Sequence, residues 1–193
     1  MGRIKYGIDL GTTNSAITKI EKGESVIIKS DSQGDTTPSC VGYRKKGSVM
    51  SGVRAFNTLK ADKLKALKSG KSSESNFWVE FKRTMGSDKK YHSSICDEDF
   101  SSEELSSEVL KKLKSYLQDE VIKSAVITIP AMFNDNQKSA TQKAAELAGI
   151  SQAELLQEPI AAAMAYGLDE KTKDGNLLIF DFAGGTFDVC LVK

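Results

Sequence analysis

Apolar residues in the first 30 positions occur in short runs that are separated by polar or glycine-containing turns. Residues 4–10 and 15–20 are two such runs, joined by the turn sequence GTTN, and residues 26–28 are a third. Short apolar runs bounded by turn residues are typical of β-strands. The pattern therefore predicts a β-hairpin followed by a third strand.

The second half of the chain alternates between helical and strand periodicity. Behind the sequence SSEE, which has the form of a capping box, leucine or valine recurs at every fourth position from 105 to 117 and predicts a helix with one buried face. The further expected elements are a strand at 125–129, a helix at 134–148, a strand at 154–157, a helix from Pro159 to Gly167, a strand at 177–182 and a last strand to Val192. Three strands followed by alternating helices and strands predict an α/β fold with a mixed five-stranded sheet flanked by helices.

Between residues 39 and 104 the composition shifts to a Lys- and Ser-rich one with weak periodicity. Such a shift inside an otherwise regular pattern predicts a small inserted subdomain. We accordingly divide the chain into a core subdomain at 1–38 and 105–170, an inserted subdomain at 39–104, and a separate hairpin at 171–193.

Charge and cysteine content narrow the class of protein. There are 27 Lys and Arg against 26 Asp and Glu, a formal net charge of +1, whereas nucleic-acid coats and membrane-surface proteins usually carry a basic excess. The start of the chain lacks the apolar core of a signal peptide, and no run approaches the roughly 18 apolar residues of a membrane span. His92 and three widely spaced cysteines build neither a zinc site nor a disulfide framework. We therefore expect a cytoplasmic protein with neither nucleic acid nor a membrane as partner.

Two stretches repeat one chemical pattern. In DLGTT at 9–13 and in DFAGGT at 181–186, an apolar strand ends in an aspartate that glycine and threonine follow. Glycine-bearing turns expose backbone N–H groups to phosphate oxygens, and threonine hydroxyls add donors. An aspartate beside a phosphate chain implies an intervening cation such as Mg²⁺. The pair predicts a site for a polyphosphate and its metal; the alternative is two ordinary hairpin turns with incidental Asp and Thr.

Five blocks of the sequence, GIDLGTTNS, FKRTMG, AVITIPAMFND, QEPIAAAMAYGLD and FDFAGGTFD, together resemble the ATPase domain of the heat shock protein 70 (DnaK-like) chaperones. The resemblance covers essentially the whole chain and is loosest from Lys46 to Gly70. It implies an actin-like ATPase fold, related to the ribonuclease H-like fold, in which this chain is the first lobe and 171–193 is the first hairpin of a truncated second lobe.

The same resemblance implies an activity, ligands and partners. The parent protein would couple ATP hydrolysis to binding and release of unfolded polypeptides, and this chain alone would be poorly active. The implied ligands are ATP or ADP and Mg²⁺, with K⁺ as a further ion. The implied protein partners are a J-domain co-chaperone and a nucleotide exchange factor.

The resemblance also implies roles for single residues. Asp9 and Asp181 would hold Mg²⁺ through water, Lys82 would neutralise charge on the transferred phosphate, and Glu158 would orient the attacking water with Asp181. Taken alone, Lys82 has the ordinary interpretation of a solvated surface charge, and Glu158 that of a helix cap. The two phosphate loops would consist of Gly11, Thr12, Thr13 and Asn14 and of Gly184, Gly185 and Thr186, with Thr186 also in the catalytic set.

Four positions depart from the family's usual residues. Ala183 replaces the first of three glycines, so a left-handed backbone there would be strained. Met132 replaces a Tyr. Lys138 replaces an Arg that relays nucleotide state, and Lys lacks the planar fork of Arg. Glu154 replaces an Arg that faces J-domain co-chaperones, which puts that contact in doubt.

Three other functions are compatible with parts of this pattern. A ribonuclease H-like nuclease would use Asp9, Glu158 and Asp181 for two metals, but the balanced charge and the Gly-Thr turns argue against it. A small-molecule kinase of the actin-like superfamily is the second, and the FKRTMG block argues against it. The third is a scaffold lobe without turnover.

Overall fold

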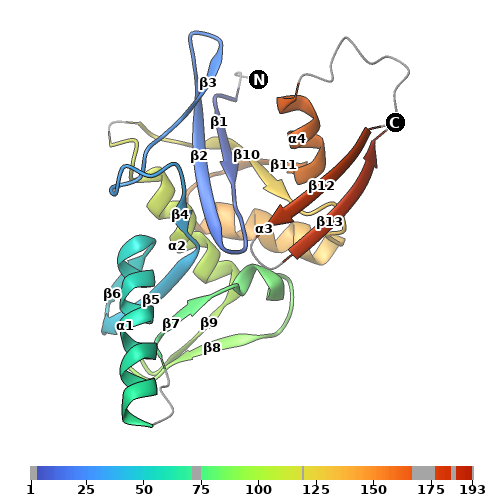
Figure 1. The fold of residues 1–193 in the computed structure, drawn as a ribbon. Helices are drawn as coiled ribbons and strands as arrows, with labels where there is room; N and C mark the ends of the chain where they lie inside the picture. The colour runs from blue at the N-terminus through green and yellow to red at the C-terminus, as the bar shows by residue number, and fades with distance from the viewer. Residues whose placement is uncertain (1–3, 71–74, 119, 167–176, 184–185, 193) are drawn as a thin grey trace.

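The main sheet places strands from the beginning of the chain beside strands from its second half. The computed structural model describes residues 4–70, 75–118, 120–166, 177–183 and 186–192 (Figure 1). The strand order is β11-β10-β1-β2-β3, with β10 parallel to both β1 and β11 and with β1, β2 and β3 antiparallel. The strands are β1 (Tyr6–Asp9), β2 (Asn14–Glu21), β3 (Glu24–Ile27), β10 (Ser124–Ile129) and β11 (Gln152–Gln157). The predicted mixed five-stranded sheet is confirmed, and the short β4 (Thr37–Pro38) adds a sixth strand beside β2.

Helices α2 (Ser102–Lys114) and α3 (Asp135–Leu147) pack against each other and share a core with the sheet. Both begin with a complete capping box. Ser101 accepts the Glu104 N–H while the Glu104 carboxylate accepts the Ser101 N–H, as predicted, and Asn134 and Gln137 do the same for α3. The core beneath them is largely aliphatic, with Phe81 as a buried aromatic ring, and it includes Ile8, Leu10, Ile17, Leu105, Val109, Leu113, Ile127 and Ala144.

The inserted segment contains more regular structure than its weak periodicity indicated. It holds a three-stranded sheet of order β6-β5-β7, a long helix α1, a 3₁₀ helix η1 and the hairpin β8-β9. These elements are β5 (Cys40–Lys45), β6 (Ser48–Ser51), α1 (Val53–Ser69), β7 (Phe77–Val79), η1 (Phe81–Thr84), β8 (Lys90–Ser93) and β9 (Glu98–Ser101). A small core of Cys40, Ala55, Leu59 and Phe77 holds α1 on the sheet. This core uses few residues per element, which explains why α1 was not predicted from the hydrophobic pattern.

Helix α4 (Glu158–Ala165) lies between the main sheet and a separate hairpin of β12 (Leu177–Ala183) and β13 (Thr186–Val192) (Figure 1). The predicted hairpin is therefore confirmed. Ala183 is the last residue of β12 and pairs with Thr186. Its backbone is extended, a conformation that any residue adopts, so the strain considered for this position does not arise.

The cysteines and the histidine lie apart in the structure. The three cysteines are free thiols, and burial raises the pKa of Cys40 to about 12. His92 lies exposed on β8, where its Nδ1 is 2.8 Å from Asp99 Oδ1. Among the described residues, no helix is both long and apolar enough to cross a membrane.

One polar cluster ties the start of the main sheet to the segment that follows α2. The Glu120 carboxylate accepts hydrogen bonds from the Tyr6 hydroxyl and from the Lys19 ammonium, and Tyr6 and Lys19 are cross-strand partners on β1 and β2. The hydrogen bonds from Lys19 and then Tyr6 lower the pKa of Glu120 below 4.5. The hydrogen bond to Glu120 raises the pKa of Tyr6 above 10.0 and that of Lys19 above 10.5.

The cluster predicts a specific pH dependence of stability. A carboxyl group with a lowered pKa stabilises the fold above its unfolded value and loses that contribution as the pH falls through its folded value. The raised pKa of Tyr6 means that its contribution is lost as the pH rises through the folded value, above 10.0. We expect Glu120→Gln to lower the urea midpoint at pH 7 and to lower it less at pH 3. An equal loss at both pH values would contradict this assignment.

Candidate functional site

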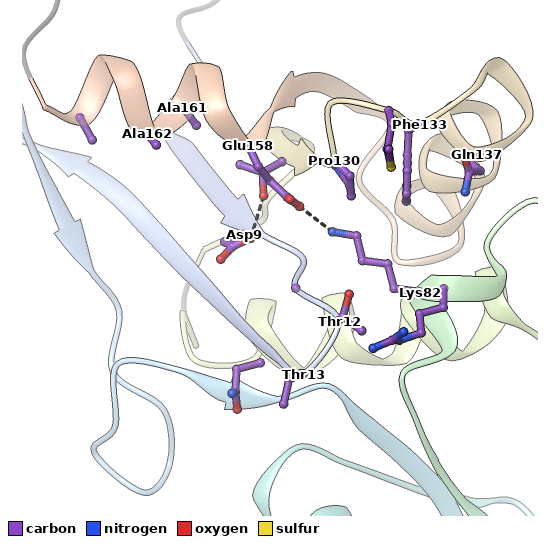
Figure 2. A pocket seen from close by; sticks show the side chains of 16 residues that line it. Asp9, Thr12, Thr13, Lys82, Pro130, Phe133, Gln137, Glu158, Ala161 and Ala162 are labelled. Carbon is purple, nitrogen blue, oxygen red and sulfur yellow. Dashed lines mark hydrogen bonds and ion pairs between the residues drawn. The ribbon is translucent and has the colours of Figure 1, made fainter. Parts of the chain in front are cut away.

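A single cavity of about 690 Å³ collects most of the residues that the sequence singled out (Figure 2). This volume falls within the range of small-molecule sites. Its lining comes from the β1–β2 turn, from η1, from the segment between β10 and α3, and from α4. The lining residues are Asp9, Gly11, Thr12, Thr13, Asn14, Lys82, Arg83, Thr128, Pro130, Met132, Phe133, Gln137, Glu158, Ala161, Ala162 and Ala165.

The first predicted phosphate loop, Asp9, Lys82 and Glu158 all line this cavity. The second predicted loop cannot be compared in the same way. Gly184 and Gly185 lie outside the described residues, as do the side chains of Asp181 and Thr186, whose backbones belong to β12 and β13. The described residues of the site belong to the main sheet and its connections, the inserted segment and helices α3 and α4.

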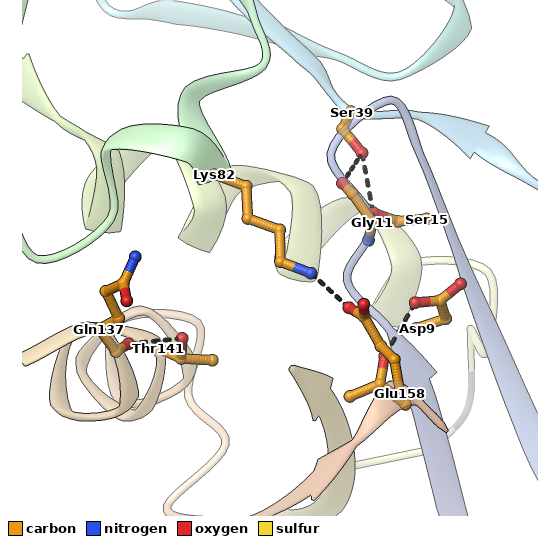
Figure 3. Close-up of polar contacts among 9 residues, drawn as sticks. Asp9, Gly11, Ser15, Ser39, Lys82, Gln137, Thr141 and Glu158 are labelled. Atoms are coloured by element: carbon orange, nitrogen blue, oxygen red, sulfur yellow. Dashed lines mark hydrogen bonds and ion pairs between the residues drawn. The ribbon is translucent and has the colours of Figure 1, made fainter. Parts of the chain in front are cut away.

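Lys82 reaches the cavity from η1 and meets Glu158 from the first turn of α4. Its Nζ lies 2.7 Å from Glu158 Oε1, and the Lys82 residue is only 5% exposed (Figure 3). The same ammonium lies 5.7 Å from the centre of the Phe133 ring. The interpretation of Lys82 as a solvated surface charge is wrong. The helix-cap interpretation of Glu158 is wrong as well, because the N-cap of α4 is Gln157 and no side chain caps it.

The position of Lys82 depends on how η1 is attached. The Thr84 hydroxyl lies 2.8 Å from the Ser102 hydroxyl at the start of α2. Just after η1, Gly86 has φ +73° and approaches the first turn of α3 so closely that a Cβ would lie 2.9 Å from the Asn136 backbone. A glycine meets both demands because it has no side chain and tolerates positive φ. The FKRTMG block thus fixes the inserted segment against two helices of the core.

The first predicted phosphate loop is held by two buried serines. The Gly11 N–H donates to Ser15 Oγ at 3.2 Å, and Ser39 Oγ donates to the Gly11 carbonyl at 2.7 Å (Figure 3). The two hydroxyls lie 2.9 Å apart, and the Ser39 N–H donates to the Thr13 carbonyl at 2.8 Å. The carbonyls of Gly11 and Thr13 therefore both face Ser39.

This arrangement changes the reason for the glycine. We expected Gly11 to let a phosphate oxygen approach its own N–H, but that N–H is bonded to Ser15. A Cβ at Gly11 would instead lie 2.0 Å from the Asn14 carbonyl oxygen. The glycine is required by the tight turn itself, and Gly11 lines the cavity together with Thr12, Thr13 and Asn14.

Asp9 stands at the end of β1 with an oriented carboxylate. Its Oδ1 accepts a hydrogen bond from Thr128 Oγ1 on the neighbouring parallel strand β10 at 2.8 Å. Thr128 also lines the cavity. Among the described residues, no three acidic, His or Cys side chains gather into a metal cluster. One carboxylate suits Mg²⁺, which keeps several waters and binds through one or two carboxylates together with phosphates.

Several residues of the site were not identified from the sequence. Ser15 and Ser39 are 24 positions apart and Thr128 lies inside a strand, so no local motif connects them to the loop or to Asp9. Thr128 had one usable signal, since it is a polar residue near the carboxyl end of the strand that was expected to follow the first helix. Arg83, Phe133 and Gln137 also line the cavity without having been predicted.

The remaining departures from the family pattern have clear positions. Met132 is 78% exposed at the cavity. Lys138 pairs with Asp135 one turn earlier on α3 at 3.1 Å. Glu154 is exposed on β11, an edge strand of the main sheet.

Comparison with known proteins agrees with the resemblance seen in the sequence. The family model of the Hsp70 protein matches residues 5–193. The chaperone protein DnaK of Thermosipho africanus and that of Thermosipho melanesiensis are each 42% identical over 192 residues, covering 97% of this chain and 30% of the relative. The chaperone protein dnaK of Thalassiosira pseudonana is 40% identical over 202 residues, covering 97% of this chain and 33% of the relative.

This chain spans about a third of the length of the curated relatives that it matches. The matches do not support the nuclease or the small-molecule kinase. The actin-like ATPase fold of the matched family agrees with the mixed sheet flanked by helices, so the predicted fold class is confirmed. Since the family match extends over nearly every residue, including the loop and the lysine that line the cavity, the chain belongs to the Hsp70 family.

Proposed function

We propose that this chain is the first-lobe part of an ATP-binding and ATP-hydrolysing domain of an Hsp70-type chaperone. The cavity would receive the phosphates of ATP or ADP. The single observation that carries this proposal is a buried lysine ammonium that shares one cavity with a Gly-Thr-Thr-Asn turn and an oriented aspartate. An anion is the natural ligand of such a site, because backbone and hydroxyl donors and a desolvated cation all favour negative charge.

In this proposal the two groups of the ion pair have different tasks. Lys82 neutralises the charge on the transferred phosphoryl group, and Glu158, with Asp181, orients the attacking water. Thr186 and the Gly184-Gly185 turn complete the phosphate contacts from the other side. Phosphoryl transfer asks mainly for positioning and charge stabilisation, so neither a histidine nor a cysteine nucleophile is required.

The metal would sit beside Asp9. Asp9 and Asp181 would hold Mg²⁺ through water, with K⁺ as a further ion, and the bound Mg²⁺ would offset the charge of the phosphates. The hydrogen bond from Thr128 supports this role, since it fixes one oxygen of Asp9 and so sets the direction of the other.

Hydrolysis in the whole protein would drive binding and release of unfolded polypeptides in the cytoplasm. A J-domain co-chaperone and a nucleotide exchange factor would set the rate of that cycle. The acidic Glu154 on the exposed edge strand β11 makes an ordinary J-domain contact at this position unfavourable.

The proposal is tested first at Lys82. In the full-length parent protein, Lys82→Met should lower the single-turnover rate of ATP hydrolysis by roughly a hundredfold or more, the size of effect seen when one group that stabilises transition-state charge is removed. ATP affinity should change by only a few fold. Rapid-quench measurement of the hydrolysis rate, with calorimetry for binding, checks both. A site that binds ATP without any turnover in the wild-type protein would favour the scaffold alternative.

The matched control is Lys114→Met. Lys114 is a half-buried lysine on α2 whose Nζ donates to the Ala148 carbonyl at 2.7 Å, and it does not line the cavity. Its replacement removes a charge and a hydrogen bond and should lower the thermal midpoint while leaving the hydrolysis rate unchanged. If both variants lose turnover to the same degree, the loss reports stability and Lys82 has no special role.

The serines that hold the loop provide a second prediction. Ser39→Ala removes the donor to the Gly11 carbonyl, so we expect faster amide exchange at residues 11–13 and about a three- to tenfold loss in ATP affinity, since a buried acceptor left unpaired costs about 1–3 kcal/mol. NMR-detected hydrogen exchange in the 193-residue chain measures the first effect, and ATP titration measures the second.

Tyr116→Phe is the control for Ser39→Ala. It deletes the hydroxyl that lies 2.9 Å from Thr37 Oγ1, only two positions before Ser39. This variant should lose a comparable amount of stability without any change in exchange at residues 11–13. Unchanged exchange in Ser39→Ala would refute the role of Ser39 in holding the loop.

A further inference from the structure

Positive charge is concentrated in one part of this nearly neutral chain. Residues 44–69 contain eight of the 27 basic residues and one of the 26 acidic ones, a formal charge of +7. The rest of the chain holds 19 basic and 25 acidic residues, a formal charge of −6. The overall charge of +1 therefore conceals a strongly basic segment, which comprises the β5–β6 turn and helix α1.

All eight of these cations are exposed. They are Arg44, Lys45, Lys46, Arg54, Lys60, Lys63, Lys65 and Lys68. Within the described part of the chain, only Arg44 of the eight makes an ion pair, at 3.8 Å from Asp62. The charge of this segment is thus largely uncompensated by its own protein, and it favours an anionic partner.

Helix α1 extends this basic segment away from the core. Its buried residues, Ala55 and Leu59, belong to its first half. From residue 60 to 69 only Asp62 and Ala66 are half-buried, and every other position is exposed. Figure 1 shows the C-terminal end of α1 projecting beyond the strands of the inserted segment, at the end of the molecule opposite to the β2–β3 turn. The projecting end gains little stability from packing. Short helical segments without tertiary contacts are only marginally stable in water.

The projecting end combines charge with exposed leucines. Leu64 is 53% exposed and Leu67 is 80% exposed. Lys60, Leu64 and Leu67 are at positions i, i+4 and i+7 and therefore lie on one face of the helix. The Lys60 ammonium lies 4.3 Å from the centre of the Phe56 ring, one turn earlier on the same face. The surface formed by Phe56, Lys60, Lys63, Leu64, Leu67 and Lys68 is called the α1 surface below.

We propose that the α1 surface binds an acidic amphipathic helix of a partner protein. A partner helix that presents leucines and carboxylates in alternation would cover Leu64 and Leu67 and pair with Lys60, Lys63 and Lys68 at the same time. Helix-on-helix recognition of this kind is read through anchors spaced at i, i+3 and i+4. No residue of α1 lines the cavity, so this proposal does not depend on the proposed function.

Two other anionic partners fit the α1 surface less well. A lipid surface would have to accept the leucines in its apolar layer, but Lys60 lies in the same row and would be carried in with them. A nucleic acid would gain from exposed aromatic rings, and the only ring among residues 44–69, that of Phe56, is half-buried and faces the Lys60 ammonium. A protein helix satisfies the leucines and the cations together.

The test uses the intact chain and a defined probe. The probe is a synthetic helical peptide in which leucine recurs at i, i+3 and i+4 and glutamate occupies the flanking positions. Fluorescence anisotropy should show binding that weakens as salt is raised, because exposed ion pairs are screened. Leu67→Ser should weaken binding about tenfold, because it removes an apolar side chain that the partner helix would bury. Replacing Lys60 and Lys63 together with glutamine should weaken binding several fold and reduce the salt dependence.

The matched control replaces Lys22 and Lys123 with glutamine. Both are exposed lysines outside the inserted segment, and the change in net charge is the same. This control should bind the peptide as the wild type does. Equal losses in the control and in the Lys60 and Lys63 variant would show nonspecific attraction and overturn the proposal. Absence of peptide binding, or tighter α1-dependent binding to phosphatidylserine vesicles or duplex DNA than to the peptide, would overturn it as well.

Discussion

The ion pair between Lys82 and Glu158 is the contact on which the geometry of the site depends. Lys82 belongs to the inserted segment and Glu158 to the first turn of α4, and the 2.7 Å contact joins them across the cavity. A buried ammonium that loses its partner costs about 3–5 kcal/mol, so the pair strongly favours one relative placement of these elements. The pair is also the point at which a bound anion would compete with Glu158 for Lys82. In the proposed function, the same two side chains would therefore both hold these elements together and respond to the bound ligand.

In the rest of the cavity, hydrogen bonds within the protein fix the orientation of polar groups. The buried Ser15 hydroxyl accepts a hydrogen bond from the Gly11 N–H, and the buried Ser39 hydroxyl donates to the Gly11 carbonyl. The Ser39 backbone N–H donates to the Thr13 carbonyl. Thr128 fixes the only acidic side chain at the end of β1. The contacts of Ser15 and Ser39 join the β1–β2 turn to β2 and to the residue that follows β4, and the contact of Thr128 joins the neighbouring strands β1 and β10. Buried hydroxyls thus set the orientation of the turn.

Sequence patterns predicted the parts of this structure that follow local rules. The strands of the main sheet, the capping box of α2 and Pro159 in the first turn of α4 agree with the structure because short-range periodicity and capping chemistry determine them. Helix α1 was missed, since only two of its residues are fully buried and the apolar residues of its lysine-rich end, Leu64 and Leu67, are exposed among charged neighbours. The hydroxyl contacts of Ser39 and Thr128 were also missed. They depend on which strands become neighbours, and that information is not present in any short stretch of sequence.

The weak attachment of the end of α1 has a consequence for how this protein can diversify. Between residues 60 and 69 only Asp62 and Ala66 are even half-buried, so insertion of a turn or replacement of its charges would disturb little of the core. The elements that line the cavity are, by contrast, tied together by close backbone approaches at Gly11 and Gly86, where any side chain would clash. Substitutions at the helix end should therefore change stability little, whereas substitutions at the cavity should destabilise the fold. The choice of partner at α1 can evolve quickly while the chemistry of the cavity stays the same.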